Sequence, residues 1–457
     1  MAVAGTRDLT VGGITPTLLR FTMPMMLGSL MQQCYNIADT LIVGRCIGSG
    51  ALAAVGSAYS LMTFLISVLL GLAMGSGTVF SLQFGAGNMS GLRRSIYVSL
   101  VLIGCVTAAL TVASFALIDP ILRLLQVPAE IYGMLRLYLL IIFGGIPFTF
   151  LYNFYAALLR AVGDSVTPLW FLGVSVVLNI GLDLLFILGF GMGVDGAALA
   201  TVAAQGVSAL GLTVFVLRRR PELRLRKEDM RLDGDSVKEI ASFSSLTCVQ
   251  QSVMNFGILM VQGLVNTFGT AVMAAFAAAV KIDSFAYMPV QELGNAFSTF
   301  VAQNYGARKS GRIRRGVRSA LLISVIFSLA VSVLVFVLAR PLMLIFVRAE
   351  EVEIIRIGVQ YLRVEGSFYF GIGILFLLYG YYRAIRMPAM SVVLTVLSLG
   401  TRVLLAYMLA SVPSVGVTGI WWSIPIGWVL ADAVGIAYYF HLRRKNVNLR
   451  KQQSRQL

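Results

Sequence analysis

The stretch GAGNMSGLRR at residues 85–94 returns as GARKSGRIRR at residues 306–315. A glycine and an alanine open both copies and two arginines close them, so Gly85 corresponds to Gly306 and Arg94 to Arg315 at one constant offset. The same offset, with a slip of two residues later in each half, relates further positions: Gly48 and Gly269, Ala53-Ala54 and Ala274-Ala275, Pro120 and Pro341, Glu130 and Glu351, Arg160-Ala161 and Arg383-Ala384, Val194 and Val417, Gly196 and Gly419. Because so long a period is not that of a solenoid, the repeat predicts two similar half-chains of about 200 residues.

The composition is that of a membrane protein. Hydrophobic residues make up 58% and charged residues 12% of the chain, and the mean hydropathy is +0.86. A soluble globule of this composition would lack polar surface. Apolar runs long enough for a membrane helix, which needs about 20 residues, fall near residues 16–44, 52–83, 95–118, 131–159, 168–190, 196–217, 240–266, 271–302, 317–339, 354–382, 389–410 and 417–440. Six runs in each half predict an all-α integral membrane fold of twelve transmembrane helices in two pseudo-symmetric six-helix bundles.

The positive charges predict an orientation. Of the 36 Lys and Arg residues, 26 fall on one side of the predicted spans and 5 on the other. By the positive-inside rule we expect both termini in the cytoplasm, in a multi-pass protein of the inner (plasma) membrane. The net charge of +16 is then mostly a topology signal and a contact with anionic lipid heads. It does not indicate a nucleic-acid partner, because no basic stripe alternates with exposed aromatic residues.

One charged segment separates the halves. Residues 218–239 are predicted to link a first bundle at residues 1–217 to a second at residues 240–442, and a basic cytoplasmic tail follows at residues 443–457. The four cysteines lack CxxC spacing and the chain has a single histidine. We therefore expect no disulfide, no catalytic set, no enzyme activity and no cofactor.

Polar side chains inside the predicted spans are the candidate functional residues, because ionisable groups are costly in a bilayer. In the first span Gln32, Asn36 and Asp39 follow one another at i, i+4 and i+7, so they share one helix face that we expect to meet a cavity. Three further candidates lie in the fifth and sixth spans: Asn179, Asp183 and Thr201. Two carboxylates, an amide and a hydroxyl suit a hard cation or a shared proton. The alternative is that these groups only hydrogen-bond neighbouring helices.

The second half has different polar groups. Gln251, Asn255 and Gln262 fall on one face of the seventh span and are candidates for substrate contact, with interhelical hydrogen bonding as the alternative. Glu292 in the eighth span is a further candidate for lining a substrate site. The remaining acids of these spans are Asp283, Glu365 and Asp432.

A paired charge is the other reading of those acids. Lys281 or Arg402 could neutralise Asp283 or Glu292 across helices, and pairing is the commoner fate of a buried acid.

Several short motifs follow one another over almost the whole chain: Tyr35-Asn36-Ile37-Ala38-Asp39-Thr40, Ala53-Ala54-Val55-Gly56, Gln83-Phe84-Gly85-Ala86, Leu158-Leu159-Arg160-Ala161-Val162-Gly163-Asp164, Asn179-x-x-x-Asp183 and Gln303-Asn304-Tyr305-Gly306-Ala307. Each is short and weak alone. With their order, their spacing and the duplicated twelve-helix frame, the chain resembles prokaryotic transporters of the multidrug and toxic compound extrusion (MATE) family.

The resemblance implies two bundles around a central cleft that opens to each side in turn. It also implies export of a substrate in exchange for inward H+ or Na+. The Met and aromatic residues of the second half favour a small organic, amphipathic cationic compound, because aromatic faces attract positive charge and Met packs around varied shapes. Asp39, Asn179, Asp183 and Thr201 match the cation site of the first bundle in one branch of the family, with no metal beyond Na+. We expect a monomer in the bilayer, and a bend in the first span at Pro24, because proline removes a helical hydrogen bond.

Two departures leave an alternative open. A second branch of the family carries an acid in the seventh span, where this chain has Gln250, Gln251 and Asn255, so a carboxylate site there is absent or replaced. A related superfamily branch flips lipid-linked oligosaccharides and needs a cationic cavity for a pyrophosphate head. Three cations inside or beside the second-half spans keep that function as the alternative: Lys281, Arg363 and Arg402.

Overall fold

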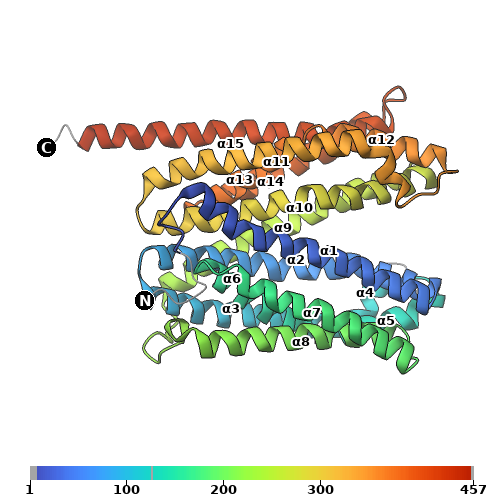
Figure 1. Ribbon diagram of the computed structural model, residues 1–457, viewed down its shortest axis with the longest axis horizontal. Coiled ribbons are helices and arrows are strands. Elements are labelled where there is room, and N and C mark those ends of the chain that lie inside the picture. The colour runs from blue at the N-terminus through green and yellow to red at the C-terminus, as the bar shows by residue number, and fades with distance from the viewer. Residues whose placement is uncertain (1–7, 125–126, 454–457) are drawn as a thin grey trace. The chain divides into compact units, whose positions relative to one another are not determined.

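The computed structural model describes residues 8–124 and 127–453, and all regular structure in these ranges is helical (Figure 1). The helices are α1 (Ile14–Cys46), α2 (Ser49–Gly85), α3 (Met89–Ala116), α4 (Ile118–Leu124), α5 (Ala129–Gly144), α6 (Ile146–Ala161), α7 (Val166–Leu184), the π-helix η1 (Leu185–Gly189), α8 (Val194–Arg219), the 3-10 helix η2 (Pro221–Leu223), α9 (Gly234–Asn266), α10 (Thr270–Gly306), α11 (Ser310–Leu344), α12 (Val352–Gly366), α13 (Tyr369–Ala384), α14 (Pro388–Ala410) and α15 (Val417–Gln453).

The predicted spans are confirmed as helices. Among the described residues, nine helices are long and apolar enough to cross a membrane, and the bent pairs α5–α6 and α12–α13 raise this number to eleven. Helix α1, 33 residues long, covers the first predicted span but is not among these eleven, so the predicted number of twelve is approximately met in the described residues. The pairs bend by 43° and 51° at corresponding places of the two halves. In the first pair Pro147 enters at the start of α6, where its missing N–H is tolerated.

The backbone repeats with the sequence. Gly87 (φ +69°) and Arg308 (φ +57°), which correspond in the repeat, both adopt the left-handed conformation that ends α2 and α10. Gly163 (φ +88°) and Arg386 (φ +66°) do the same after α6 and α13. This conformation is less favourable for an arginine than for a glycine, which has no Cβ atom. The turn geometry is therefore retained in the second half even where the glycine is not.

The chain forms two compact units. The first unit comprises Met1–Ser252 and Thr299–Gly316, and the second comprises Val253–Ser298 and Val317–Leu457, so α9 and α10 each contribute to both. In the first unit α7 packs against α1 and α8, while α2 packs against α3, α5 and α6 (Figure 1). In the second unit α15 packs against α12, α13 and α14 around a core that includes Phe276, Tyr361 and Trp421.

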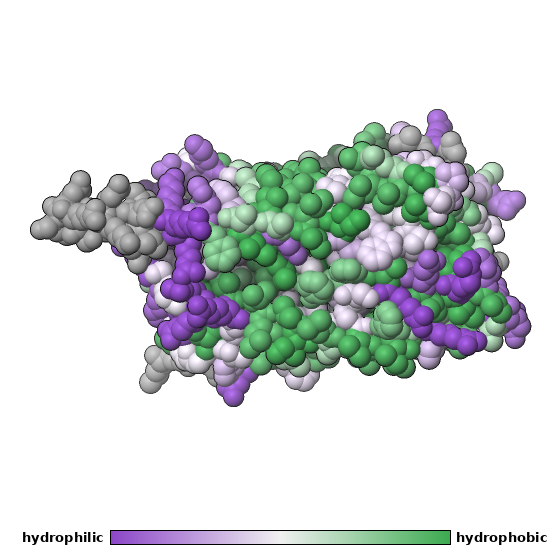
Figure 2. Space-filling model, turned by 90° about the horizontal axis from the view of Figure 1, so that it is seen from above, coloured by the Kyte–Doolittle hydropathy of each residue, from purple (hydrophilic) through white to green (hydrophobic). Residues whose placement is uncertain are grey.

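The outer surface of the helices is apolar. On α11 the exposed residues are largely aliphatic or aromatic: Leu322, Ile326, Leu329, Val333, Phe336 and Val337. Figure 2 shows hydrophobic side chains over the middle of one face and hydrophilic side chains gathered toward both ends. Side chains of this kind are stable against lipid tails, which agrees with a membrane-spanning protein.

The segment between the halves is partly ordered by polar contacts with the first unit. Helix α9 begins at Gly234, inside the segment predicted as linker, and the 3-10 helix η2 buries Leu223. Arg93 and Ser90 of α3 both donate to Asp229, and the hydrogen bond from Arg93 lowers the pKa of that carboxyl. Helix α15 continues to Gln453, through most of the segment predicted as a tail.

Candidate functional site

Helices α1, α7 and α8 of the first unit position the predicted cation site. Asn179 and Asp183 lie one turn apart at the end of α7, where they are 1% and 0% exposed. Asp183 stands next to the last residue of α7, directly before the π-helix η1. Because α7 packs against both α1 and α8, a side chain pointing inward from this turn meets both neighbours.

A chain of hydrogen bonds links the three helices. Asn179 Nδ2 donates to Thr201 Oγ1 of α8 at 3.3 Å. The Tyr35 hydroxyl of α1 lies 3.3 Å from the same Thr201 oxygen. Asp39, one turn further along α1, has its carboxyl beside that of Asp183. The structure therefore brings together all four residues predicted for the cation site.

Within the part of the chain that the structure describes, no basic residue neutralises the carboxylates of this site. Asp39 Oδ1 and both carboxyl oxygens of Asp183 are buried and accept no hydrogen bond from the described residues. Neither acid forms an ion pair with a lysine or arginine within residues 8–124 and 127–453. Two adjacent ionised carboxylates without a counter-ion are costly at this depth. A proton shared between them, or a hard cation held by the Asp, Asn and Thr oxygens, removes that cost.

Sequence reasoning did not select two tyrosines of this site. Tyr35 bonds Thr201, and Tyr138 of α5, 8% exposed, lies near Tyr35 and Asp39. Helical spacing could have indicated Tyr35, because it lies one turn before Asp39 and therefore on the same face of α1. Tyr138 has no comparable signal, because the sequence does not reveal that α5 packs against α8.

The other candidates of α1 have more exposed surroundings. Gln32 is exposed, and Asn36 is half-buried and donates to Gln33 of its own helix at 3.2 Å. Pro24 lies inside α1 as predicted. The bend expected at this proline stays a prediction, as does the substrate contact of Gln32 and Asn36.

The candidates of α9 and α10 are divided between the units. Gln251 belongs to the first unit, is 8% exposed, and its Nε2 lies 3.9 Å from Met74 Sδ. Asn255 and Gln262 belong to the second unit, where Gln262 donates to Asn266 of the same helix at 2.9 Å. Glu292 of α10 is half-buried. Their role in substrate contact stays a prediction.

The second unit contains a second buried charged cluster. Asp283 of α10 and Glu365 of α12 are 4% and 3% exposed and lie beside each other. Arg402 of α14, 9% exposed, is close to both acids. Two tyrosines complete the cluster: Tyr361 and Tyr369. Of the two cations expected beside Asp283 or Glu292, Arg402 lies close to Asp283, whereas Lys281 is exposed.

Comparisons with known proteins agree with this architecture. The MatE family model matches residues 24–185 and 246–408, one range in each half of the repeat. The chain is 30% identical to the probable multidrug resistance protein YpnP of Bacillus subtilis over 445 residues, which covers 97% of this chain and 98% of that protein. It is 28% identical over 416 residues to the probable multidrug resistance protein NorM of Thermotoga maritima, covering 89% of this chain and 88% of that protein.

The fold is similar to solved structures along nearly all of its length. A multidrug resistance MATE family transporter of the MOP superfamily, solved in an outward-facing conformation, has a TM-score of 0.91 to this chain at 24% identity. The alignment covers 99% of this chain and 100% of that one. Since the family model matches both halves and a relative is 30% identical over almost the full length, the chain belongs to the MatE family of multidrug and toxic compound extrusion transporters.

Proposed function

We propose that the protein exports small organic, amphipathic cationic compounds by alternating access, in exchange for inward movement of H+ or Na+. The observation that carries this proposal is the adjacent pair Asp39 and Asp183, which has no basic partner among the described residues. Asp183 is fully buried, and Asp39 is half-buried with its Oδ1 enclosed. Such a pair has to gain a proton or a cation before it is stable in a closed, dry environment. The occupancy of the site and the conformation of the surrounding helices are therefore coupled.

The surrounding groups determine what the pair can hold. Asn179 and Thr201 are fixed by their mutual hydrogen bond, so their free oxygen lone pairs face a site of constant shape. One proton between the two carboxyls leaves a single negative charge, and a second proton leaves none. Na+ uses the same oxygens as ligands, because hard cations prefer carboxylate, amide and hydroxyl oxygens.

The driving force follows from the orientation that the positive-inside rule favours. With the linker and both termini in the cytoplasm of a plasma-membrane protein, a cation enters the site from outside and leaves inward. Each inward elementary charge gains about 2.3 kcal/mol per 100 mV of membrane potential. Export of a monovalent cationic substrate moves one such charge outward, so a single coupling cation per cycle makes the exchange electroneutral. Two coupling cations per cycle can therefore maintain roughly a hundredfold or greater gradient of that substrate once a concentration difference of the coupling ion is added.

The names of two relatives and the composition of the chain support the proposed substrate class. YpnP and NorM carry the name multidrug resistance protein, and their relatedness favours substrates of varied shape. The chain contains 19 Met and 48 aromatic Phe, Trp and Tyr residues. Polarisable thioethers and aromatic faces suit amphipathic cations.

The lipid-linked oligosaccharide flippase is less well supported. Its pyrophosphate head needs several converging cations, but Lys281 and Arg363 are exposed, and the Arg363 guanidinium lies over the Phe336 ring at 5.3 Å. Of the three cations only Arg402 is buried, and its charge lies close to the acids Asp283 and Glu365.

The test is transport into inside-out membrane vesicles with one imposed gradient at a time. We expect accumulation of a fluorescent lipophilic cation under an H+ or a Na+ gradient, and none after the gradient is dissipated. Accumulation that persists without any ion gradient contradicts the antiporter. Translocation of a labelled lipid-linked oligosaccharide, with no export of lipophilic cations, favours the flippase instead.

A further inference from the structure

The backbone just before α1 is held by the turn between α10 and α11, which belongs to the other half of the sequence repeat. We call residues 9–12 the strap and residues 303–312 the clasp. The Leu9 N–H donates to Gln303 Oε1 at 3.0 Å, and the Leu9 carbonyl accepts from Asn304 Nδ2 and Arg312 Nε, each at 3.2 Å. Leu9 itself is 1% exposed. Both polar groups of a buried backbone unit are thus satisfied by the clasp.

Two cations of the clasp hold the rest of the strap. Lys309 Nζ donates to the carbonyl and the hydroxyl of Thr10, each at 2.9 Å. Arg312 donates to the Val11 and Gly12 carbonyls, each at 2.6 Å. Four consecutive carbonyls therefore accept from the clasp, and each of them accepts from a charged donor. Charge-assisted hydrogen bonds of this kind are stronger than neutral ones.

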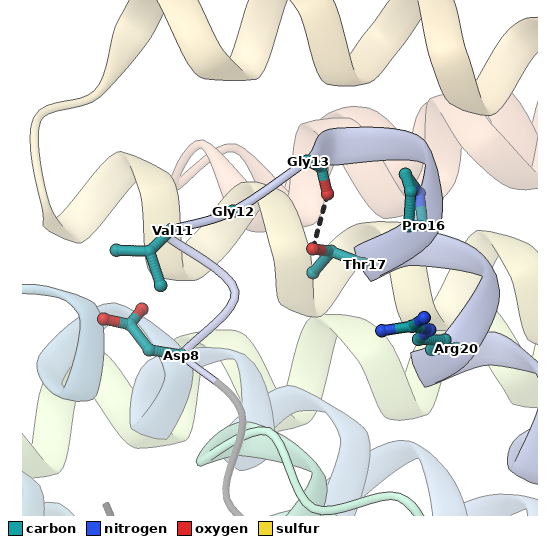
Figure 3. A pocket seen from close by; sticks show the side chains of 7 residues that line it. All are labelled: Asp8, Val11, Gly12, Gly13, Pro16, Thr17 and Arg20. Atoms are coloured by element: carbon teal, nitrogen blue, oxygen red, sulfur yellow. Dashed lines mark hydrogen bonds between the residues drawn. The ribbon is translucent and has the colours of Figure 1, made fainter.

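The strap forms a turn of its own, and a hollow separates it from the start of α1. Asp8 Oδ1 accepts from the Thr10 N–H at 2.8 Å, and Gly12 has φ +73°, so a turn leads into α1. Between this turn and the start of α1 lies a hollow of about 400 Å³. Figure 3 shows the residues that line it: Asp8, Val11, Gly12, Gly13, Pro16, Thr17 and Arg20. The strap is thus fixed mainly by the clasp and less by its own helix.

The clasp itself lies where two helix ends cross without side chains between them. A Cβ atom on Gly85 of α2 would lie 2.0 Å from the Gln303 carbonyl oxygen, and one on Gly306 of α10 would lie 2.1 Å from the Leu82 carbonyl oxygen. The two glycines are counterparts in the repeat. Gln303 Nε2 also donates to the Ala161 carbonyl at the end of α6 at 2.7 Å. The end of α10 is therefore held by α2, by α6 and, through Gln303 Oε1, by the strap.

We infer that the strap is a latch on the linker end of the transporter. Its hydrogen bonds hold the end of α10 against α2 and α6 while the linker end of the transporter is closed. In every cycle these hydrogen bonds between strap and clasp have to break before the end of α10 can move away. This inference rests on the proposed alternating access, because only a transporter that opens at this end has to part such a contact. Beyond alternating access itself, residues 9–12 and their hydrogen bonds then determine how readily the linker end of the transporter opens.

The direct test cross-links the strap to the clasp through disulfide bonds that can be reduced. In a background in which Cys34, Cys46, Cys105 and Cys248 are replaced by serine, the double variant Thr10→Cys with Lys309→Cys is joined by a short bis-methanethiosulfonate linker. Uptake of a lipophilic cation into inside-out vesicles is measured before linking, after linking and after reduction. We expect linking to reduce uptake at least tenfold and reduction to restore it. Uptake that continues at the unlinked rate in fully linked protein overturns the latch.

A matched control places the same linker in the corresponding turn of the first half. Asn88 Nδ2 donates to Gln83 Oε1 at 3.0 Å, and these two positions correspond to Lys309 and Asn304 in the repeat. Gln83→Cys with Asn88→Cys joins one turn to itself, so its linking should leave uptake unchanged. If the unlinked variants and the parent chain transport nothing under any gradient, the proposed function fails. If they transport and linking the strap pair leaves uptake as unchanged as linking the control pair does, the latch alone fails.

A second measurement loosens the latch instead of locking it. Arg312→Ala removes three hydrogen bonds to the strap, whereas Arg314→Ala removes the same charge from an exposed residue of the same helix. We expect the Leu9 amide to exchange hydrogen at least about tenfold faster in Arg312→Ala than in the parent, with no change in Arg314→Ala. Equal exchange in all three proteins contradicts the role of these bonds in holding the strap.

Discussion

The buried ion pair between Asp164 and Arg220 makes a quantitative prediction about stability. Asp164 Oδ2 accepts from Arg220 Nη2 at 2.6 Å, and the two side chains are 1% and 2% exposed. Arg220 Nε and Nη1 are also buried and have no partner in the described structure, so this carboxylate is the only group there that balances the guanidinium. Asp164 also accepts from the N–H and the hydroxyl of Thr167 at the start of α7.

Removing the acid alone should destabilise the fold strongly. Asp164→Ala leaves a buried guanidinium unpaired, which costs about 3–5 kcal/mol, and it also removes the bonds at the start of α7, worth about 1 kcal/mol. In a thermal-shift assay on detergent-solubilised protein we expect the apparent Tm to fall on the order of 10 °C. Adding Arg220→Met to Asp164→Ala should recover most of this loss, because the uncompensated charge is gone.

The exposed pair Glu353 and Arg356 is the matched control. Its side chains are 61% and 66% exposed at an oxygen–nitrogen distance of 2.8 Å, so Glu353→Gln should leave the apparent Tm unchanged. The reasoning is refuted if Asp164→Ala is as stable as Glu353→Gln, or if Arg220→Met brings no recovery in the Asp164→Ala background.

Three further predictions concern movement and orientation. Gly306→Ala should abolish export, because its Cβ would collide with the Leu82 carbonyl. Gly311→Ala has open space around its Cβ and should export at the parental rate. Equal vesicle uptake in both variants argues against the close crossing of α2 and α10. Pro24→Ala should slow export at undiminished protein abundance, since it restores a helical hydrogen bond, and unchanged export removes any role for a bend there. A cysteine at Asp235 should react with an impermeant maleimide only in inside-out vesicles, and reaction in intact cells reverses the proposed orientation.

The sequence predicts most of the fold because its signals are local or repeated. Apolar runs of sufficient length become helices wherever they occur, and the constant offset of the repeat reappears as matched left-handed residues at Gly87 and Arg308. The length of several runs predicted tilts or kinks, but the positions of the bends within the fourth and tenth spans were not predicted, because a run such as 131–159 is apolar on both sides of Gly145. The first turns of α9 are polar, so the sequence placed the end of the linker at residue 239, while the helix begins at Gly234.

The site could be predicted in part, for a related reason. Polarity inside the predicted spans identified Asp39, Asn179, Asp183 and Thr201, and the resemblance to a family matched these four to one cation site. Spacing does not reveal which helices touch, so the approach of Asp283 to Glu365 had no signal in the sequence. The same holds for the strap, because Leu9 and Gln303 are 294 residues apart and their contact depends on the complete fold.

The central claim is that Asp39 and Asp183 couple ion entry to export. The measurement is gradient-driven uptake of a lipophilic cation by inside-out vesicles containing Asp39→Asn, Asp183→Asn or Glu365→Gln at matched protein levels. We predict that each of the first two variants abolishes uptake under both H+ and Na+ gradients, because an amide can neither gain and lose the proton nor supply the charge that holds Na+. Should both variants build a substrate gradient at the parental rate while Glu365→Gln does not, the coupling site lies in the second unit and this account of the first is wrong.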